Sequence, residues 1–248
     1  MPHSPAIALL ARTPSLAART RIHLLQPQVL MHKLTLIRRP ERTARDFRSL
    51  IREISFYLGY EATQGLRTRE VTVATTRPEP CMGKKISDTV AVIPILRGGL
   101  GMVEPLLELL PNSPVYHIGM YRNPGSQIPV QYFNRLPKGK PSDIAFVLDP
   151  VIASSKTICA TISILKKWGA KKIKVLTLVA SKCGLAALLE QHPDVAVHAA
   201  SIDELAENGV DLVPGIGDAG DRLYYTGANS YDEDLLSPPA ARKVPKRK

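Results

Sequence analysis

Cysteine is scarce in this sequence, and no long apolar run occurs in it. The three cysteines, Cys81, Cys159 and Cys183, are widely spaced and odd in number, which favours neither a disulfide framework nor a zinc site. Within residues 1–21 the longest apolar run is residues 6–11, which is too short for a membrane span or for the hydrophobic part of a secretory signal. We therefore expect a protein of a reducing compartment that has no membrane partner, with the cytoplasm preferred.

Acidic residues are missing from both ends of the chain. Residues 1–40 carry six Lys or Arg and residues 242–248 carry five. These charges account for the whole net charge of +11, so residues 41–241 sum to zero. A core that binds nucleic acid normally carries a basic face of its own. We therefore expect no nucleic-acid partner.

The same pattern suggests how the chain is divided. We expect an N-terminal extension without fixed structure over residues 1–21, one folded domain over 22–229 and a basic tail over 230–248. The extension contains Arg and no acid, so import into an organelle remains an alternative to the cytoplasm. The tail is interpreted as a solvated end, with a nuclear-localisation signal as the alternative.

The folded part alternates short apolar runs with segments whose apolar residues recur at helical spacing. The expected strands are 71–73, Val90–Leu96, 115–120, Ile144–Leu148, 173–179 and 195–202. The expected helices are 45–58, ending at Gly59, 103–110, 158–168, ending at Gly169, and 184–191. Strands that alternate with helices predict an α/β fold with a mostly parallel sheet.

Two stretches interrupt this alternation. Residues 75–85 contain Pro78, Pro80 and Gly83 and are predicted to be rich in turns. Residues 121–141 contain four prolines and show little periodicity. A loop of that length between two core strands is usually functional.

The most informative stretch is residues 144–168, which is predicted to be a strand, a loop and a helix. The strand is closed by Asp149-Pro150, and the loop 151–157 is rich in small and hydroxyl side chains. Free backbone N–H groups and the positive end of the helix dipole favour an anion at such a helix start. An acid at the strand end can reach a sugar hydroxyl or a metal. An ordinary strand-to-helix connection is the alternative.

Two further loops follow expected strands. Arg97-Gly98-Gly99 places a cation beside backbone that can approach a ligand closely, which suits a diphosphate; a tight turn with a surface arginine is the alternative. Residues 214–222 contain glycines at 215, 217 and 220 in a G-x-G-x-x-G pattern. We reject a dinucleotide-binding fingerprint because no helix is expected after them. A rigid loop that presents backbone groups to a flat ligand is the better interpretation.

Other candidate motifs are weak. Ser155-Lys156-Thr157 matches the end of a nucleotide P-loop, but both glycines of that motif are absent. His117, His192 and His198 lie on or beside expected core elements without ligand spacing. We therefore expect structural roles for these histidines and no metal site made by side chains alone.

Together the three loops make the chain resemble the uracil phosphoribosyltransferases, a type I phosphoribosyltransferase family. The resemblance covers about residues 22–227. The segments that carry it are 32–34, 60–63, 94–102, 120–122, 132–137, 148–150, 192–194, 201–203 and 213–222. It implies a mostly parallel sheet flanked by helices, with a small hood formed by the N-terminal and C-terminal parts.

The resemblance also implies a reaction and a set of site residues. The family joins uracil to 5-phosphoribosyl 1-diphosphate (PRPP), giving UMP and diphosphate, usually with Mg²⁺. By resemblance, the catalytic residues are Arg97, Arg122, Asp149 and Asp218. The residues expected to bind PRPP are Arg97, Arg122, Asp149, Pro150, Val151, Ile152, Ala153, Ser154, Ser155, Lys156, Thr157 and Asp218. Those expected to meet uracil are Leu212, Gly217, Asp218 and Ala219. Family members commonly form dimers or tetramers, and some respond to GTP.

One departure from the family pattern concerns the phosphate loop. Where the family usually has Ala-Thr-Gly-Gly-Ser, this chain has Ala-Ser-Ser-Lys-Thr at 153–157. If Ser155 and Lys156 need a positive φ, each replacement costs about 1 kcal/mol or more, although Lys156 can supply an ammonium to the same phosphate. Gly98, where the family tends to have Ala, is a milder departure. The sequence therefore leaves two hypotheses: an active enzyme, or a weak or inactive homologue that serves as a nucleotide-binding regulatory or structural subunit.

Overall fold

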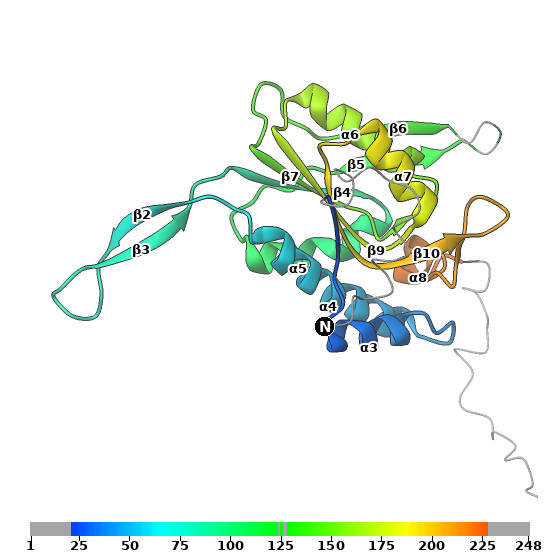
Figure 1. Cartoon of the computed structure of the whole chain (residues 1–248), viewed down its shortest axis with the longest axis horizontal. Helices are drawn as coiled ribbons and strands as arrows, with labels where there is room; N and C mark the ends of the chain where they lie inside the picture. The colour runs from blue at the N-terminus through cyan, green and yellow to red at the C-terminus, as the bar shows by residue number, and fades with distance from the viewer. Residues whose placement is uncertain (1–20, 124, 126–127, 228–248) are drawn as a thin grey trace, which may run out of the picture.

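The computed structural model describes residues 21–123, 125 and 128–227, and the fold is that of these residues (Figure 1). The expected extension and basic tail lie almost entirely outside the described residues. Among the described residues, no helix is long and apolar enough to span a membrane.

A mostly parallel sheet of nine strands forms the centre of the molecule. Its main path runs β1 (Ile22–Leu24), β10 (Ala196–Leu205), β9 (Lys172–Ser181), β7 (Ile144–Leu148), β4 (Val90–Leu96), β5 (Ile118–Arg122) and β6 (Pro129–Asn134). Every neighbouring pair on this path is parallel except β5 and β6. Two short strands complete the sheet: β8 (Val151–Ile152) beside β9, and β11 (Leu212–Val213), antiparallel to β10. The α/β prediction is confirmed.

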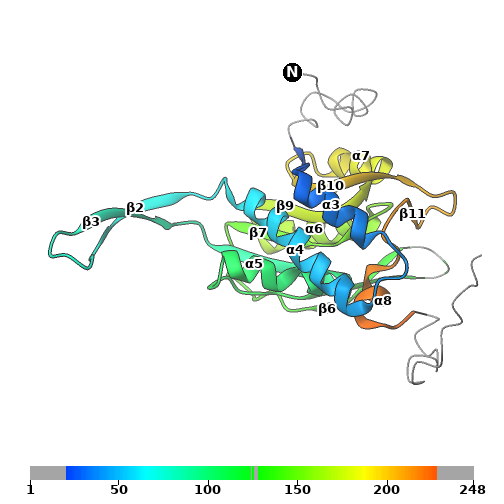
Figure 2. The same cartoon turned by 90° about the horizontal axis from the view of Figure 1, so that it is seen from below.

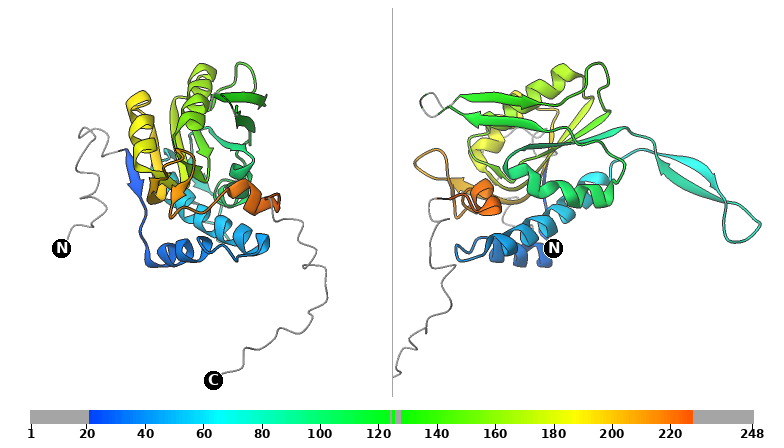
Figure 3. Two further views of the ribbon diagram at one scale, coloured as in Figure 1. Left: turned by 90° about the vertical axis from the view of Figure 1, so that its right-hand side faces the viewer. Right: turned by 180° about the vertical axis from the view of Figure 1, so that it is seen from behind.

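Helices cover both faces of this sheet (Figure 3). The helices on one face are α3 (Gln28–Ile37), α4 (Ala44–Thr63), α5 (Val103–Leu109) and α8 (Ala219–Tyr224). Those on the other are α6 (Lys156–Trp168) and α7 (Lys182–Gln191). Side chains alternate across the pleat, so Phe146 packs in the core under α4 while its neighbour Val147 packs in the core under α6. This two-sided burial explains why the central strands are continuous apolar runs.

Helix α4 is longer than the sequence pattern predicted. It begins after Thr43, whose side chain accepts a hydrogen bond from the Asp46 N–H at 3.1 Å, and it runs through Gly59 instead of ending there. A Cβ at Gly59 would lie 3.0 Å from the side chains of Leu106 and Leu109. This glycine therefore permits close packing between α4 and α5 and does not stop the helix. Helix α3 was not predicted, although Leu30, Leu34 and Ile37 are buried at helical spacing.

Two stretches predicted to be irregular contain strands. β2 (Thr68–Val73) and β3 (Cys81–Ile86) form an antiparallel hairpin that projects from the body of the molecule (Figures 1 and 2). Only the first part of the predicted turn-rich segment 75–85 is therefore a turn. The predicted loop 121–141 likewise contains β6, which pairs with β5. We call the β2–β3 hairpin, residues 68–86, the arm.

Candidate active site

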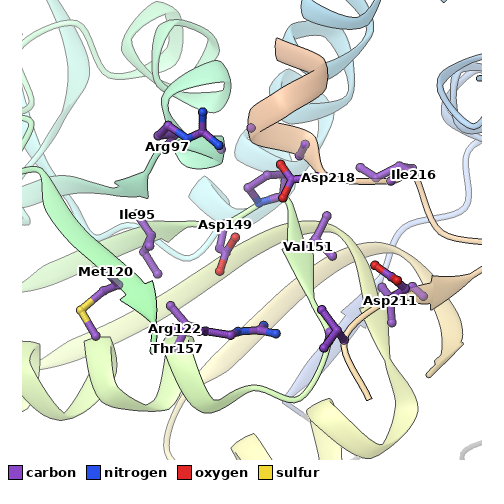
Figure 4. Close-up of a pocket in the computed structure, with 18 of the residues that line it drawn as sticks. Ile95, Arg97, Met120, Arg122, Asp149, Val151, Thr157, Asp211, Ile216 and Asp218 are labelled. Carbon is purple, nitrogen blue, oxygen red and sulfur yellow. The ribbon is translucent and has the colours of Figure 1, made fainter. Parts of the chain in front are cut away.

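The three loops singled out from the sequence meet at one edge of the sheet. β4, β5 and β7 are parallel, so Arg97, Arg122 and Asp149 come together at their carboxyl ends, where open α/β sheets usually bind ligands. The segment after β11 closes the other side of a pocket of about 530 Å³ (Figure 4). The predicted site residues that line it are Arg97, Arg122, Asp149, Pro150, Val151, Ala153, Thr157, Leu212, Gly217, Asp218 and Ala219.

Asp149 lies at the floor of the pocket, directly after β7. Its side chain points into the pocket beside Arg122 (Figure 4). Burial raises the pKa of the Asp149 carboxyl to about 7, although a hydrogen bond from the Val151 N–H and the charge of Arg122 both lower it. The Asp149 carboxyl can therefore lose its proton near neutral pH when a ligand or a cation approaches it.

The predicted phosphate loop folds into the start of α6. The Ala153 carbonyl accepts a hydrogen bond from the Ser181 hydroxyl at 2.5 Å. Gly184 lets α7 approach this carbonyl, because a Cβ there would lie 2.1 Å from the Ala153 oxygen. Ser155 precedes α6 but its side chain makes no capping hydrogen bond. The N–H groups of the first helical turn are thus left available to an anion.

The two substituted glycine positions differ in conformation. Ser155 has φ 60° and ψ −4°, in the left-handed region, whereas Lys156 is the first residue of α6. Ser155 is buried and makes a hydrogen bond with the Cys159 thiol, while Lys156 is exposed. Ser155 alone therefore carries the expected backbone strain. Ile152, Ser154, Ser155 and Lys156, although predicted to bind PRPP, are not among the side chains that line the pocket.

A buried ion pair holds the loop predicted to meet uracil. Arg38 donates to both carboxylate oxygens of Asp203, at 2.6 and 2.9 Å, and to the carbonyl of Gly215 at 2.8 Å. Asp203 in turn accepts from the Gly215 N–H at 2.9 Å. Burial raises the pKa of Asp203, but the hydrogen bonds from Arg38, Ser201 and Gly215 together lower it by more. The net shift of the pKa is therefore downward. The carboxylate therefore stays charged and fixes Gly215, which has φ 59°.

Arg222 fixes the same loop from the other side. Its Nη1 donates to the carbonyls of Ile37, at 2.8 Å, and Ile216, at 2.7 Å, and its guanidinium lies 4.1 Å from the ring centroid of Phe47. These bonds join the end of α3 to the C-terminal loop. The N-terminal and C-terminal parts, which the resemblance predicts to form a hood, are therefore in contact here.

The glycine-containing segment 214–222, which we call the glycine loop, leads into a helix, α8. No helix was predicted there from the sequence. Asp218 accepts a hydrogen bond from the Asp221 N–H at 2.8 Å and so caps the short α8. The dinucleotide interpretation still fails because the loop follows β11, which is antiparallel to β10 and does not open a strand–helix–strand unit. Gly217 has φ 71°, a conformation that a glycine adopts without strain.

Arg97 lies at the rim of the pocket, after β4. Its guanidinium donates to Asp221 and Thr226, each at 2.9 Å. Gly99 permits the turn, because a Cβ there would lie 2.3 Å from the carbonyl oxygen of Leu148. A Cβ at Gly98 would lie 3.0 Å from Cγ of Pro150, so the alanine usual in the family needs a small shift here.

Two of the three histidines singled out from the sequence have side-chain contacts outside the pocket. No group of three or more His, Cys, Asp or Glu within the described ranges is placed to hold a metal ion. His192 Nε2 lies 3.2 Å from the carbonyl oxygen of Cys159, and His198 is buried and stacked on His23 at 4.5 Å. None of these rings lines the pocket.

Sequence reasoning assigned no role to Arg38, Asp203, Asp221 or Arg222, the side chains that hold the loops and Arg97. Arg38 and Asp203 are 165 residues apart, and Arg97 and Asp221 are 124 apart. No local pattern links side chains at such separations. The resemblance marked the segments that contain Asp203 and Asp221, and this was the one signal available.

An α/β sheet with an acid, two arginines and an uncapped helix start at its carboxyl edge is the arrangement that the resemblance to type I phosphoribosyltransferases predicts. A family model described as uracil phosphoribosyltransferase matches residues 24–226. The chain belongs to the uracil phosphoribosyltransferase family.

Named relatives agree with this assignment. The uracil phosphoribosyltransferase of Roseiflexus sp. is 45% identical over 202 residues, which are 82% of this chain and 97% of the relative. That of Alkaliphilus oremlandii is 41% identical over 211 residues, 84% of this chain and 99% of the relative. The solved structure of the AQ2163 protein from Aquifex aeolicus matches 84% of this chain and 99% of its own, with a TM-score of 0.78 and 29% identity. None of these comparisons supports the alternative of an inactive homologue.

Proposed function

We propose that the chain joins uracil to PRPP and releases diphosphate and UMP. The observation that carries this proposal is the single pocket in which Arg97, Arg122, Asp149 and the 212–219 loop meet. Family membership supplies the identity of the two substrates.

The pocket offers a separate place for each part of PRPP. Asp149 accepts hydrogen bonds from the ribose hydroxyls, and the loop 150–157 with the first turn of α6 binds the 5′-phosphate. Lys156, exposed beside this turn, adds an ammonium to the phosphate. The arginines at 97 and 122 bind the diphosphate.

Catalysis of this reaction depends on stabilising the charge that develops on the leaving group. Glycosyl transfer from PRPP passes through an oxocarbenium-like state while the departing diphosphate gains negative charge. Cationic groups placed on that diphosphate stabilise the transition state more than the ground state. Arg97 and Arg122 take this role, and Asp149 fixes the ribose so that the carbon under attack faces the base. The described residues include no covalent nucleophile placed for this reaction, and none is required.

The 212–219 loop selects the base. Leu212, Gly217 and Ala219 present backbone groups to the ring, and Asp218 lies between the base and PRPP. Because these groups are held rigidly by Arg38, Asp203 and Arg222, a base with the wrong donors leaves buried polar groups unpaired. We therefore expect uracil to be preferred over cytosine.

We propose Mg²⁺ as the cofactor. Mg²⁺ is usually held by one or two carboxylates together with substrate phosphates rather than by a full set of protein ligands. Asp149 and Asp218 line the pocket and offer such carboxylates. Held there with PRPP, Mg²⁺ would supply positive charge to the diphosphate.

The test is steady-state UMP formation from uracil, PRPP and Mg²⁺. We expect turnover with uracil, little with cytosine, and a loss of at least about a hundredfold in kcat/KM for Asp149→Ala. A folded wild-type protein that turns over neither base would contradict the proposal. Turnover of cytosine at the rate of uracil would contradict the role of the 212–219 loop.

We also propose that the protein forms a homo-oligomer through the arm and works in the cytoplasm. An isolated two-stranded hairpin is at best marginally stable in water, and the arm exposes Val73, Met82 and Ile86. A second copy that covers these side chains would remove them from water. Sedimentation of Met82→Asp tests this: a shift to the monomer is expected, and an unchanged mass contradicts the arm as the interface. Adding GTP to the same runs and to the turnover assay tests the GTP effector.

A further inference from the structure

The guanidinium of Arg97 is held by two side chains from the C-terminal part of the chain. Nη1 donates to the Thr226 hydroxyl and Nη2 donates to Oδ1 of Asp221, both at 2.9 Å. The Thr226 hydroxyl donates to the same Asp221 oxygen at 2.7 Å. The three side chains therefore form a closed triangle of hydrogen bonds at the rim of the pocket.

The backbone of α8 explains why these side chains meet. Asp221 lies in the first turn of α8, with its N–H bonded to Asp218. Tyr225, with φ 56°, ends the helix in the left-handed conformation and turns the chain back. The N–H of Thr226 then donates to the carbonyl of Asp221 at 3.2 Å. Asp221 is thereby fixed on both sides.

The carboxylate of Asp221 is charged at neutral pH. The hydrogen bond from Thr226 lowers its pKa, burial opposes this, and the bond and the charge of Arg97 lower the pKa further. An arginine presents five N–H donors, so the two bonds to Thr226 and Asp221 leave others for a ligand. Half of the Arg97 side chain is exposed, with a fraction of 50%, and without these partners it would be ordered only when an anion binds.

We propose that Asp221, supported by Thr226, is a positioning residue that holds Arg97 ready for the diphosphate; this rests on the proposed function. A cation ordered in advance loses less conformational entropy when its anion arrives. The geometry also places the acid outside the reacting centre: Arg97 lines the pocket and Asp221 does not. Asp221 therefore acts through Arg97 and not on the substrate.

The test is calorimetric titration of inorganic diphosphate with Mg²⁺, alongside KM and kcat for PRPP. Asp221→Ala is expected to weaken diphosphate binding about tenfold and to raise KM for PRPP about as much, with a smaller change in kcat. Asp221→Asn keeps an oxygen acceptor and is expected to stay within about threefold of the wild type. Thr226→Val, which keeps the shape and loses the hydroxyl, is expected to weaken binding about threefold. If Asp221→Ala does not fold, the near-isosteric variants Asp221→Asn and Thr226→Val still test the positioning role.

Two controls separate positioning from general damage. Asp194→Asn removes the charge of an acid that is paired with Lys166 at 2.5 Å outside the pocket, and it should leave diphosphate binding unchanged. In the Arg97→Ala background, Asp221→Ala should have no further effect, because the residue that it positions is gone.

The outcomes distinguish this proposal from the proposed function. Unchanged or tighter diphosphate binding in Asp221→Ala would overturn the positioning role, since it would mean that Asp221 is irrelevant to Arg97 or competes with the anion for it. A full additional effect of Asp221→Ala in the Arg97→Ala background would also overturn it. A wild type that binds diphosphate but makes no UMP would remove the proposed function alone, and the binding series would still decide the role of Asp221.

Discussion

Glycine at position 155 should give a more stable protein than alanine at the same position. Ser155 has φ 60°, and its side chain does not cap α6. An L side chain in the left-handed region costs about 1–2 kcal/mol, a cost that glycine avoids. Glycine also has greater conformational freedom in the unfolded chain, which reduces this gain in stability by about 0.4–1 kcal/mol. Glycine should therefore be more stable than alanine at this position by about 0.5–1 kcal/mol.

The comparison with alanine isolates the backbone. Ser155→Ala keeps the strained Cβ and loses the hydrogen bond to Cys159, whereas Ser155→Gly loses both. Lys156→Gly is the matched control, because Lys156 has the helical conformation of the first residue of α6. Glycine there should destabilise by about 0.5–1 kcal/mol. Relative to a residue that carries a Cβ without a hydrogen bond, glycine is thus expected to stabilise at position 155 and to destabilise at position 156.

Thermal and urea unfolding of the three variants measure these differences. For a domain of this size, Ser155→Gly should melt about 1–4 °C above Ser155→Ala. If Ser155→Gly were no more stable than Ser155→Ala, or if Lys156→Gly were stabilising, the assignment of strain to residue 155 would be refuted. PRPP titration of a further variant, Lys156→Ala, then shows whether loss of the ammonium weakens binding of the 5′-phosphate.

Other expected outcomes follow from the same structure. Burial raises the pKa of Asp149 to about 7, so its stabilising effect is present below its unfolded value of about 4 and is lost as the pH rises through 7. Urea unfolding should therefore show Asp149→Asn stabilised, by on the order of 2 kcal/mol, at pH about 8 but hardly at pH about 4; equal effects at both would contradict this. Arg38→Ala should destabilise by about 3 kcal/mol because it leaves Asp203 buried without its ion pair. In a double-mutant cycle, Arg38→Ala with Asp203→Ala should cost less than the sum of the single changes, and strict additivity would contradict a stabilising Arg38–Asp203 ion pair.

The parts of the fold that the sequence predicted well are those whose signals are local. β4 and β7 are continuous apolar runs, and Gly169, with φ 103°, ends α6 as expected. The order of these elements also predicted that Arg97 and Asp149 lie at one edge, since parallel strands share their carboxyl ends.

The parts that were missed depend on contacts with distant residues. Gly59 lies inside a helix, where Leu106 and Leu109 pack against it. The expectation that glycine ends a helix takes no account of such distant neighbours. β3 was hidden by the prolines and glycine around it, and it forms because β2 pairs with it. The conformation of Ser155 was a hypothesis that the structure supports, whereas the same hypothesis for Lys156 was wrong.

The central claim is that this pocket binds PRPP although its phosphate loop contains Ser155 and Lys156. Calorimetric titration of the wild type with PRPP and Mg²⁺ tests that claim most directly. The account predicts saturable binding by the wild type that Asp149→Asn weakens. Failure of the wild type to bind, with binding gained in the Ser155→Gly/Lys156→Gly variant, would mean that the altered loop has lost the donor substrate, and the enzyme proposed here would be contradicted.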